Sequence, residues 1–216
     1  MTELTTPRRR ARRMSPEQRR EDLIRAALEL YSTRAPELVS IDDIAAAADV
    51  SRALFYRYFT NIREVHVAAL GTAVDELCAR LTEHTGDSLL DQLRHAVTTF
   101  VDFADTYATA YIALLRSGSV VATSDTDTLV DRVRHTAVDE ILARTGVTGP
   151  SPLMLLTLRC WVAVVEGTLL TWLQERTLER GELVDWLIDQ LAAMVAATAT
   201  RDPYVAEMLT RISPQV

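Results

Sequence analysis

Lysine is absent from this sequence, and all 23 basic side chains among its 216 residues are arginine. The arginine guanidinium is a planar group with a fixed fork of donors, whereas the lysine ammonium is a compact point charge. Every cationic side chain of this protein is therefore a planar fork. Together with the many alanines, this absence indicates a compositional bias of the genome.

Cysteine and histidine are scarce. The two cysteines are far apart without a CxxC motif, and the four histidines are scattered singly. This spacing indicates neither a disulfide framework nor a metal site, and it is typical of a cytoplasmic protein. We interpret each histidine as a solvated or core residue, and we predict no metal, cofactor or catalytic residue. The residues concerned are Cys78, Cys160, His66, His84, His95 and His135.

Glycine is also rare, with 7 residues, and no segment shows the alternation typical of a strand. A hydrophobic content of 48% and this length allow a well-buried core. The longest apolar stretch, residues 153–173, contains Arg159 and Glu166, and each charge would be costly in lipid. We therefore predict a globular all-α protein that does not span a membrane.

Charge is divided unevenly along the chain. Residues 1–66 hold 12 Arg and 10 Asp or Glu, whereas residues 67–216 hold 11 Arg and 20 Asp or Glu. The formal net charge of −7 therefore conceals a basic N-terminal part. Such a division favours contact between the N-terminal part and a polyanion.

Residues 40–64, SIDDIAAAADVSRALFYRYFTNIRE, have the pattern of two short helices joined by a tight turn. Ser40 and Asp43 fit a capping box, and Asp49-Val50 forms the break before Ser51 caps the second helix. In that helix Phe55 and Phe59 share a buried face. Arg52, Ala53, Tyr56 and Arg57 then point outward, where guanidinium and hydroxyl donors suit phosphate oxygens. The alternative is a helical hairpin buried in a larger bundle, which we consider less well supported.

These residues resemble the TetR (tetracycline-repressor-like) family of bacterial transcription regulators. The resemblance runs through A-A-L-E-L-Y at residues 26–31, I-A at 44–45, V-S at 50–51 and F-Y-R-Y-F at 55–59, and continues into Asn61. These motifs cover about the first third of the chain. Beyond them, the resemblance rests on the helical layout. It implies a three-helix DNA-binding domain followed by a helical-bundle domain for ligand binding and dimerisation.

The resemblance also implies roles for particular residues. Arg52, Ala53 and Leu54 would enter the major groove, and Ser40, Tyr56 and Tyr58 would contact phosphates. The family usually has glycine where this chain has Asp49, a residue that tolerates the left-handed backbone better than most. Ile62 stands where the family often has lysine, which removes one phosphate contact. The predicted DNA-binding set of the domain is Ser40, Ser51, Arg52, Ala53, Leu54, Tyr56, Arg57, Tyr58 and Asn61.

An arginine-rich arm precedes the first helix. Ser15 as cap, Pro16 at the first helical position and Gln18 three residues on predict that this helix starts at residue 16. The arm can lie in a minor groove or act only as a solubilising tail, and either role raises affinity for DNA in a salt-dependent manner. Its basic residues are Arg8, Arg9, Arg10, Arg12 and Arg13. We divide the chain into the arm (1–14), the DNA-binding domain (15–66) and the regulatory domain (67–216).

A succession of helices is expected after residue 61. Asn61 and Glu64 fit a capping box at the start of a helix that runs to Leu81. Further helices are expected from Leu89 to Phe103, around Tyr107 to Leu114, and from Leu129 to a stop at Gly146. We interpret Ser117 to Asp127 as a polar loop.

Two long apolar helices are expected near the end of the chain. Residues 153–173 are apolar on nearly all faces, and the final helix carries an apolar stripe. Two such helices from each of two chains would form a four-helix dimer interface, as the resemblance implies; an intrachain core is the alternative. The stripe consists of Leu183, Val184, Leu187, Ile188, Leu191, Met194 and Val195.

The resemblance implies a small-molecule cavity in the regulatory domain. Aromatic and apolar residues are candidates to line it, although ordinary core positions are the more frequent role for such residues. Arg159 and Glu166 lie seven residues apart, about 10 Å along a helix, so they need other partners, and a polar group of a ligand is one candidate. The predicted ligand-binding set is Phe100, Phe103, Tyr107, Tyr111, Met154, Arg159, Trp161, Glu166 and Trp172.

The sequence thus predicts a cytoplasmic, nucleoid-associated homodimer that binds a palindromic double-stranded operator. We expect a repressor that a largely apolar small molecule releases from DNA. A helical protein-interaction module without specific DNA binding is the alternative. An all-α enzyme is disfavoured because no nucleophile–base set, metal-spaced cluster or phosphate loop is present in the sequence.

Overall fold

The computed structural model describes residues 15–83, 85–115 and 123–212, and these residues form helices and connecting turns without a strand. The all-α fold with an N-terminal DNA-binding domain is confirmed. The elements are α1 (Pro16–Tyr31), the 3-10 helix η1 (Pro36–Leu38), α2 (Ile41–Ala47), α3 (Arg52–Phe55), α4 (Ile62–Leu81), α5 (Leu89–Thr106), α6 (Ala108–Leu115), α7 (Ser124–Arg144), α8 (Pro152–Glu175), α9 (Arg180–Ala199) and α10 (Pro203–Ile212).

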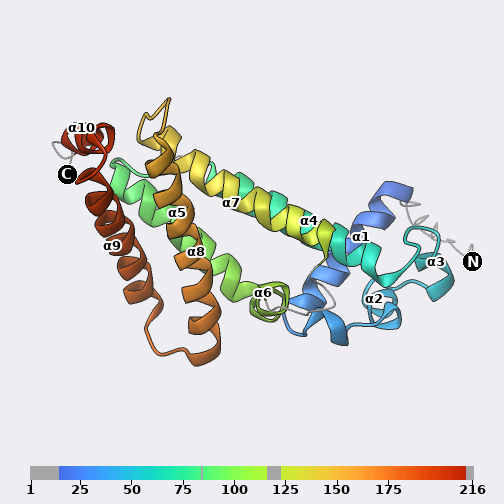
Figure 1. Cartoon of the computed structure of the whole chain (residues 1–216). Helices are drawn as coiled ribbons and strands as arrows, with labels where there is room; N and C mark the ends of the chain where they lie inside the picture. Colours follow the sequence, from blue (N-terminus) through green and yellow to red (C-terminus); the bar gives the residue numbers. More distant parts are fainter. Residues whose placement is uncertain (1–14, 84, 116–122, 213–216) are drawn as a thin grey trace, which may run out of the picture.

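The helices are arranged along one long direction (Figure 1). Helix α1 and the short helices α2 and α3 lie at one end, and α9 and α10 lie at the other. Two clusters of buried side chains correspond to these parts, one built on α1–α4 and a larger one built on α5–α10. We call the end made of α1–α3 and the start of α4 the head.

Helix α4 connects the head to the rest of the molecule. Asn61 accepts from the Glu64 N–H at 3.0 Å and caps its start, as predicted. The helix packs on α1 in the head and runs beside α7 for much of its length (Figure 1). With 20 residues it is about 30 Å long, so one rigid element reaches from the head into the larger cluster.

Helix α1 starts at Pro16, as its capping residues predict. Ser15 accepts from the Gln18 N–H at 3.2 Å, and the Gln18 side chain accepts from the Ser15 N–H at 3.0 Å. Pro16 occupies the first helical position, where its missing N–H costs nothing. The capping box is worth about 0.5–2 kcal/mol and fixes the helix start.

Two sequence-based expectations for the second half of the chain were wrong. The segment expected as a polar loop, Ser117 to Asp127, becomes helical at Ser124, because Thr123 and Thr126 form a capping box there. Residues 117–122 of that segment lie outside the described residues. The helix with the apolar stripe is not the last one, since α10 follows it.

The apolar stripe of α9 is an intrachain core element. Leu183, Leu187 and Leu191 are buried within their own chain because α9 packs on α8, α5 and α10. The interpretation of this stripe as a dimer surface is therefore wrong. The exposed faces of α8 and α9 are different surfaces, which are described below.

Candidate nucleic-acid interface and ligand cavity

The turn between α2 and α3 is fixed by main-chain hydrogen bonds. The Val50 N–H donates to the Ala45 carbonyl at 2.9 Å, and the Asp49 N–H donates to the Ala46 carbonyl at 3.1 Å. This pair of bonds is a Schellman motif, which requires a left-handed residue after the C-cap. Asp49 supplies it with a φ of 52°. The sequence-based expectation that Asp49 adopts this conformation is confirmed.

Helix α3 is a single turn that two buried aromatic side chains hold in place. Phe55 and Phe59 are 0% and 1% exposed, and their ring centroids lie 5.7 Å apart. The other face of the turn is solvent-facing: Arg52, Ala53 and Tyr56 are exposed. The predicted separation of a buried and an exposed face is therefore present. Arg57 is exposed as well, whereas Leu54 and Tyr58 are half-buried.

Arg52 is held in a defined position on this exposed face. Its guanidinium donates to the Asp42 carboxylate at 2.6 Å and to the Tyr56 hydroxyl at 3.4 Å. Its guanidinium carbon also lies 5.8 Å from the centre of the Tyr56 ring. The hydrogen bond to Tyr56 and the pairing with Asp42 raise the pKa of Arg52. The guanidinium is a charged donor placed beside an aromatic ring at the surface.

The three predicted cap residues of this region already make hydrogen bonds within the head. Ser51 accepts from the Leu54 N–H at 3.2 Å, and Asn61 caps α4. The Ser40 hydroxyl donates to the Asp43 carboxylate, which lowers the pKa of Asp43 to about 2. A phosphate contact by Ser40 remains a prediction, and the charge of Asp43 beside it opposes an anion there.

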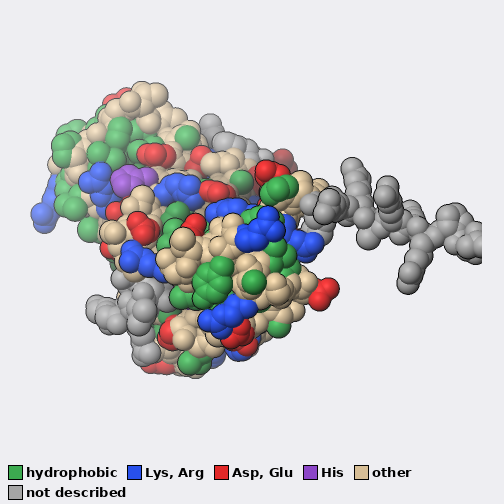
Figure 2. Space-filling view, turned by 90° about the vertical axis from the view of Figure 1, so that its right-hand side faces the viewer, with side chains coloured by type: hydrophobic (Ala, Val, Ile, Leu, Met, Phe, Trp, Pro, Cys, Tyr) green, Lys and Arg blue, Asp and Glu red, His purple; other side chains and the backbone are tan. Residues whose placement is uncertain are grey.

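The described part of the head does not carry a continuous basic patch. Figure 2 views the molecule from this end and shows Arg side chains with Asp and Glu side chains between them. Residues 15–66 hold 7 Arg and 9 Asp or Glu, so the positive balance of the N-terminal part comes from the arm. The arm arginines Arg8, Arg9, Arg10, Arg12 and Arg13 lie outside the described residues.

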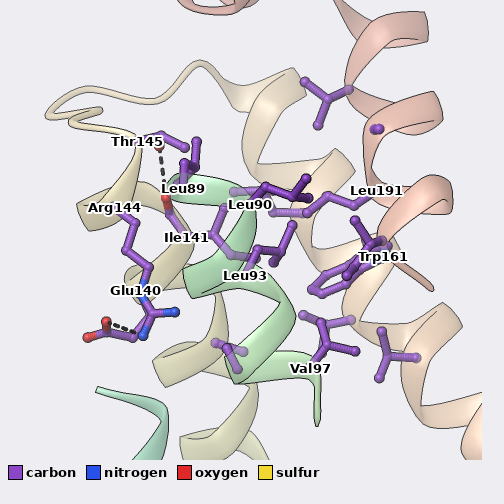
Figure 3. Close-up of a pocket in the computed structure, with 18 of the residues that line it drawn as sticks. Leu89, Leu90, Leu93, Val97, Glu140, Ile141, Arg144, Thr145, Trp161 and Leu191 are labelled. Carbon is purple, nitrogen blue, oxygen red and sulfur yellow. Dashed lines mark hydrogen bonds and ion pairs between the residues drawn. The ribbon is translucent and has the colours of Figure 1, made fainter. Parts of the chain in front are cut away.

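A cavity of about 430 Å³ lies within the larger cluster, lined by α5, α7, α8, α9 and α10. Its wall is almost entirely apolar, with leucines of α5 on one side and Trp161 and Leu191 on another (Figure 3). The volume and lining are typical of small-molecule sites, which usually measure about 300–1,000 Å³. Four residues of the predicted ligand-binding set line it: Phe100, Met154, Trp161 and Glu166.

The other five residues of that set do not line this cavity. Phe103, Tyr107 and Tyr111 line a separate pocket of only about 40 Å³ between α1, α4 and α6. Burial raises the pKa of Tyr111.

Arg159 and Trp172 were also predicted to bind the ligand, and neither lines the cavity. Arg159 lies on the exposed face of α8, away from the cavity. Trp172 donates to the Leu178 carbonyl at 2.8 Å, and the Arg176 guanidinium lies 4.3 Å from its ring. Trp172 therefore closes the end of α8 and does not contact the cavity.

Glu166 has a partner within the chain. Arg134 of α7 donates to both of its carboxylate oxygens, at 2.9 Å from Nη2 and 2.9 Å from Nε. This bidentate pairing raises the pKa of Arg134, which also donates to Asp131 at 2.9 Å. The charge of Glu166 is thus offset, and it does not require a ligand to offset it.

Two cavity residues, Glu140 and Arg144, were missed by the sequence reasoning. They come from the last turns of α7, and the Arg144 side chain is only 4% exposed. Its Nη1 donates to the Gln92 carbonyl at 3.0 Å, and its Nη2 donates to the carbonyls of Leu81 and Glu83. A basic residue in the last turn of a helix is common, and nothing in the sequence marks this one as reaching the end of α4.

Comparisons with known proteins assign both parts of the chain. Residues 23–69 match the family described as "Bacterial regulatory proteins, tetR family", and residues 89–194 match "Tetracyclin repressor-like, C-terminal domain". A tetR-family transcriptional regulator from Streptomyces coelicolor has the same fold with a TM-score of 0.88 and 37% identity. The similarity covers 94% of this chain and 91% of that one. The chain belongs to the TetR family.

Other TetR relatives are more distant. A transcriptional regulator from Pseudomonas aeruginosa has a TM-score of 0.63 at 15% identity, covering 87% of this chain and 96% of that one, and shows the shared fold alone. The HTH-type transcriptional activator FasR of Mycolicibacterium smegmatis is 32% identical over 99 residues. That match spans 45% of this chain and 45% of FasR, less than half of either protein.

Membership of the TetR family establishes a DNA-binding transcriptional regulator. The sequence-based assignment to this family is confirmed. Helix α8 is long and apolar enough to cross a membrane, but a single such helix is weak evidence because core helices of soluble proteins pass the same test.

Proposed function

We propose that this TetR protein is a homodimeric repressor that a largely apolar small molecule releases from a palindromic operator. The observation that carries the proposal is the exposed face of α3, where Arg52, Tyr56 and Arg57 project from a turn anchored by Phe55. In a twofold dimer, two such turns would enter successive major grooves roughly 34 Å apart. The role is regulatory and without catalysis.

Effector release would act through α4. The first turn of α4 lies in the head, and Leu81 at its other end lines the cavity. The Leu81 carbonyl accepts a hydrogen bond from Arg144. A ligand shifts an equilibrium only by its differential affinity for the two states, and clean switching needs about 5.5 kcal/mol. A ligand that moves the cavity wall would change the angle of α4 and hence the spacing of the two heads.

We place the dimer interface on the exposed face of α8, with the adjoining face of α9. Leu153, Leu156, Cys160, Ala163 and Gly167 recur at helical spacing and are exposed in the single chain. Such an apolar stripe, in a helix whose other side is core, is typical of a subunit contact. We therefore still propose that α8 and α9 form the dimer interface. They would do so through their exposed faces and not through the buried apolar stripe of α9.

Replacing Leu156 with glutamate should dissociate the dimer. Leu156 is 57% exposed in the single chain, so the change puts a charge into the proposed interface without disturbing the core. Light scattering after gel filtration should show the mass falling from twice the chain mass to the chain mass of 24.1 kDa. Leu38→Glu is the matched control, because Leu38 is 71% exposed in the head. A variant L156E that remains dimeric would exclude this face.

The arm should contribute a large part of the salt dependence of DNA binding. Fluorescence anisotropy on a duplex at several salt concentrations should give a linear fall of log K with log salt, with a slope of about −0.9 for each phosphate neutralised. Replacing the five arm arginines with alanine should weaken binding and flatten this slope, because the rest of the head has no positive balance. An unchanged slope would restrict the arm to a solubilising role, and the absence of any salt dependence would contradict DNA reading.

The sign of regulation is a separate part of the proposal. FasR is named an activator, but its match covers less than half of either chain. Transcription from a promoter carrying the operator, measured with and without the protein, decides the sign, and a fall supports repression. A location in the cytoplasm with the nucleoid follows from the proposed DNA binding.

A further inference from the structure

The cavity wall contains one large side chain that is fixed in place, that of Trp161. It is 5% exposed, and its indole N–H donates to the Leu187 carbonyl of α9 at 2.9 Å. Figure 3 shows the ring directed from the α8 side of the cavity towards the leucines of α5. A ring that swung aside would leave a buried N–H without a partner, which is costly. Trp161 therefore keeps its position when a ligand enters.

The other large side chains of the wall adapt more easily. Met154 and Met208 are flexible thioethers, and the leucines of the wall change rotamer without losing a hydrogen bond. Phe100 is half-buried and contacts the Tyr111 ring edge-on, with 6.3 Å between the centroids. Among the described residues that line the cavity, Trp161 thus combines the largest side chain with a hydrogen bond that fixes it.

The polar side chains of the wall are already used within the chain. The Ser88 hydroxyl donates to the Asp91 carboxylate at 2.7 Å, and the Thr145 hydroxyl donates to a main-chain carbonyl of α7 at 2.8 Å. Arg134 holds the Glu166 carboxylate through both of its oxygens. These groups have their partners before a ligand arrives.

The remaining charged pair of the wall is enclosed by protein. Glu140 and Arg144 form an ion pair at 3.5 Å, and the Arg144 side chain is 4% exposed. Glu140 Oε2 and Arg144 Nε are buried so fully that a molecule in the cavity does not reach them. A hydrogen-bonding group of a ligand would lose its water in the cavity without gaining a partner, and this loss is costly. The wall therefore selects a ligand by its volume and apolar surface.

We propose that the cavity binds a molecule without hydrogen-bonding groups, such as a hydrocarbon, and that Trp161 sets the largest size it accepts. At about 30 Å³ for each water-sized group, 430 Å³ holds roughly 14 carbon-sized groups, more than naphthalene has and fewer than pyrene has. A smaller residue at position 161 enlarges the apolar space on the α8 side. The inference rests on the proposed function for the regulatory role of the ligand.

Naphthalene and 1-naphthol test the first half of this inference, because they share one ring system and differ in a hydroxyl. Equilibrium dialysis against the full-length protein without DNA should show naphthalene binding at least about tenfold more tightly, since the buried hydroxyl finds no partner. Equal or tighter binding of 1-naphthol would overturn the proposal, and so would a lack of naphthalene binding.

The Trp161→Ala variant tests the second half. Removal of the indole opens space beside the cavity, so the ratio of the affinity for pyrene to the affinity for naphthalene should rise by at least about tenfold over that of the unchanged protein. The same dialysis measures this ratio, with the fluorescence of the two hydrocarbons as the readout.

Trp172→Ala is the matched control for the size of the change. Trp172 is the other tryptophan of α8 and also donates to a main-chain carbonyl, but it does not line the cavity, so the ratio should stay unchanged. Trp161→Phe keeps a smaller aromatic ring and should raise the ratio by less than W161A; it carries the test if W161A does not fold. An unchanged ratio in the folded variants at position 161, or an equal rise in W172A, would contradict the role of Trp161.

The outcomes separate this site from the proposed function because binding is measured without DNA. A protein that shows both preferences but keeps its operator when naphthalene is bound retains the site and loses the effector-released regulator. A protein that another molecule releases from its operator, but that lacks both preferences, retains the proposed function and loses the selection by size.

Discussion

The double variant Arg52→Ala, Tyr56→Ala is expected to lose nearly all specific operator binding. Arg52 is held on the exposed face of α3 by Asp42 and Tyr56, so its guanidinium is already positioned for a base edge or a phosphate. Loss of a base-reading arginine typically weakens binding by about tenfold or more. Because a twofold dimer carries the change twice, we expect a loss of at least about a hundredfold in anisotropy titrations with operator DNA.

A matched control separates position from charge. Arg94→Ala removes the same charge from α5, where Arg94 is exposed and pairs with Asp185 far from the head. This control should retain operator binding to within a few-fold at a given salt concentration. Equal losses in both variants would mean that only overall charge matters, and an unaffected R52A/Y56A protein would contradict DNA reading by α3.

The Phe55→Ala variant is expected to have the largest effect on stability of the head. Phe55 is fully buried and packs against Phe59 and Tyr56, and α3 has only four residues to hold it in place. Truncation of a buried phenylalanine typically costs about 3–5 kcal/mol, through lost burial and the cavity left behind. We expect the free energy of unfolding of the head to fall by about this amount, with loss of operator binding.

Hydrogen exchange locates this effect in the molecule. The amides of α1–α3 should exchange faster in F55A, whereas those of α8 and α9 should change little, since they belong to the other cluster of buried side chains. Tyr56→Ala is the control for side-chain size, because Tyr56 is 47% exposed and its removal leaves no buried cavity. Unchanged exchange throughout the head of F55A would contradict the anchoring role of Phe55.

The parts of the fold that sequence reasoning predicted correctly depend on neighbours along the chain. Ser15 with Gln18, Ser40 with Asp43, and Asn61 with Glu64 are partners three residues apart, so the capping chemistry is visible in the sequence. The left-handed Asp49 is likewise a local feature, fixed by the turn on both sides.

The errors concern contacts between helices that are distant in sequence. Glu166 finds Arg134 on another helix, and no spacing rule indicates that pairing. The apolar stripe of α9 was correctly seen as buried, but a stripe alone does not say whether its own chain or a partner covers it. Which residues line the cavity is equally hard to predict from the sequence. Trp161 and Trp172 lie on the same apolar helix, yet Trp161 lines the cavity and Trp172 bonds to the Leu178 carbonyl instead.

The hydrogen bonds from Arg144 to the end of α4 are made to main-chain carbonyls. Any residue at positions 81 or 83 has such a carbonyl, so replacement of either side chain leaves the acceptors in place. Side-chain changes at these two positions therefore leave the two acceptors of Arg144 in place, whereas the Leu81 side chain itself is buried. The donor of both bonds is the Arg144 side chain, so a substitution at position 144 is what would strengthen or weaken the connection between the cavity and the head.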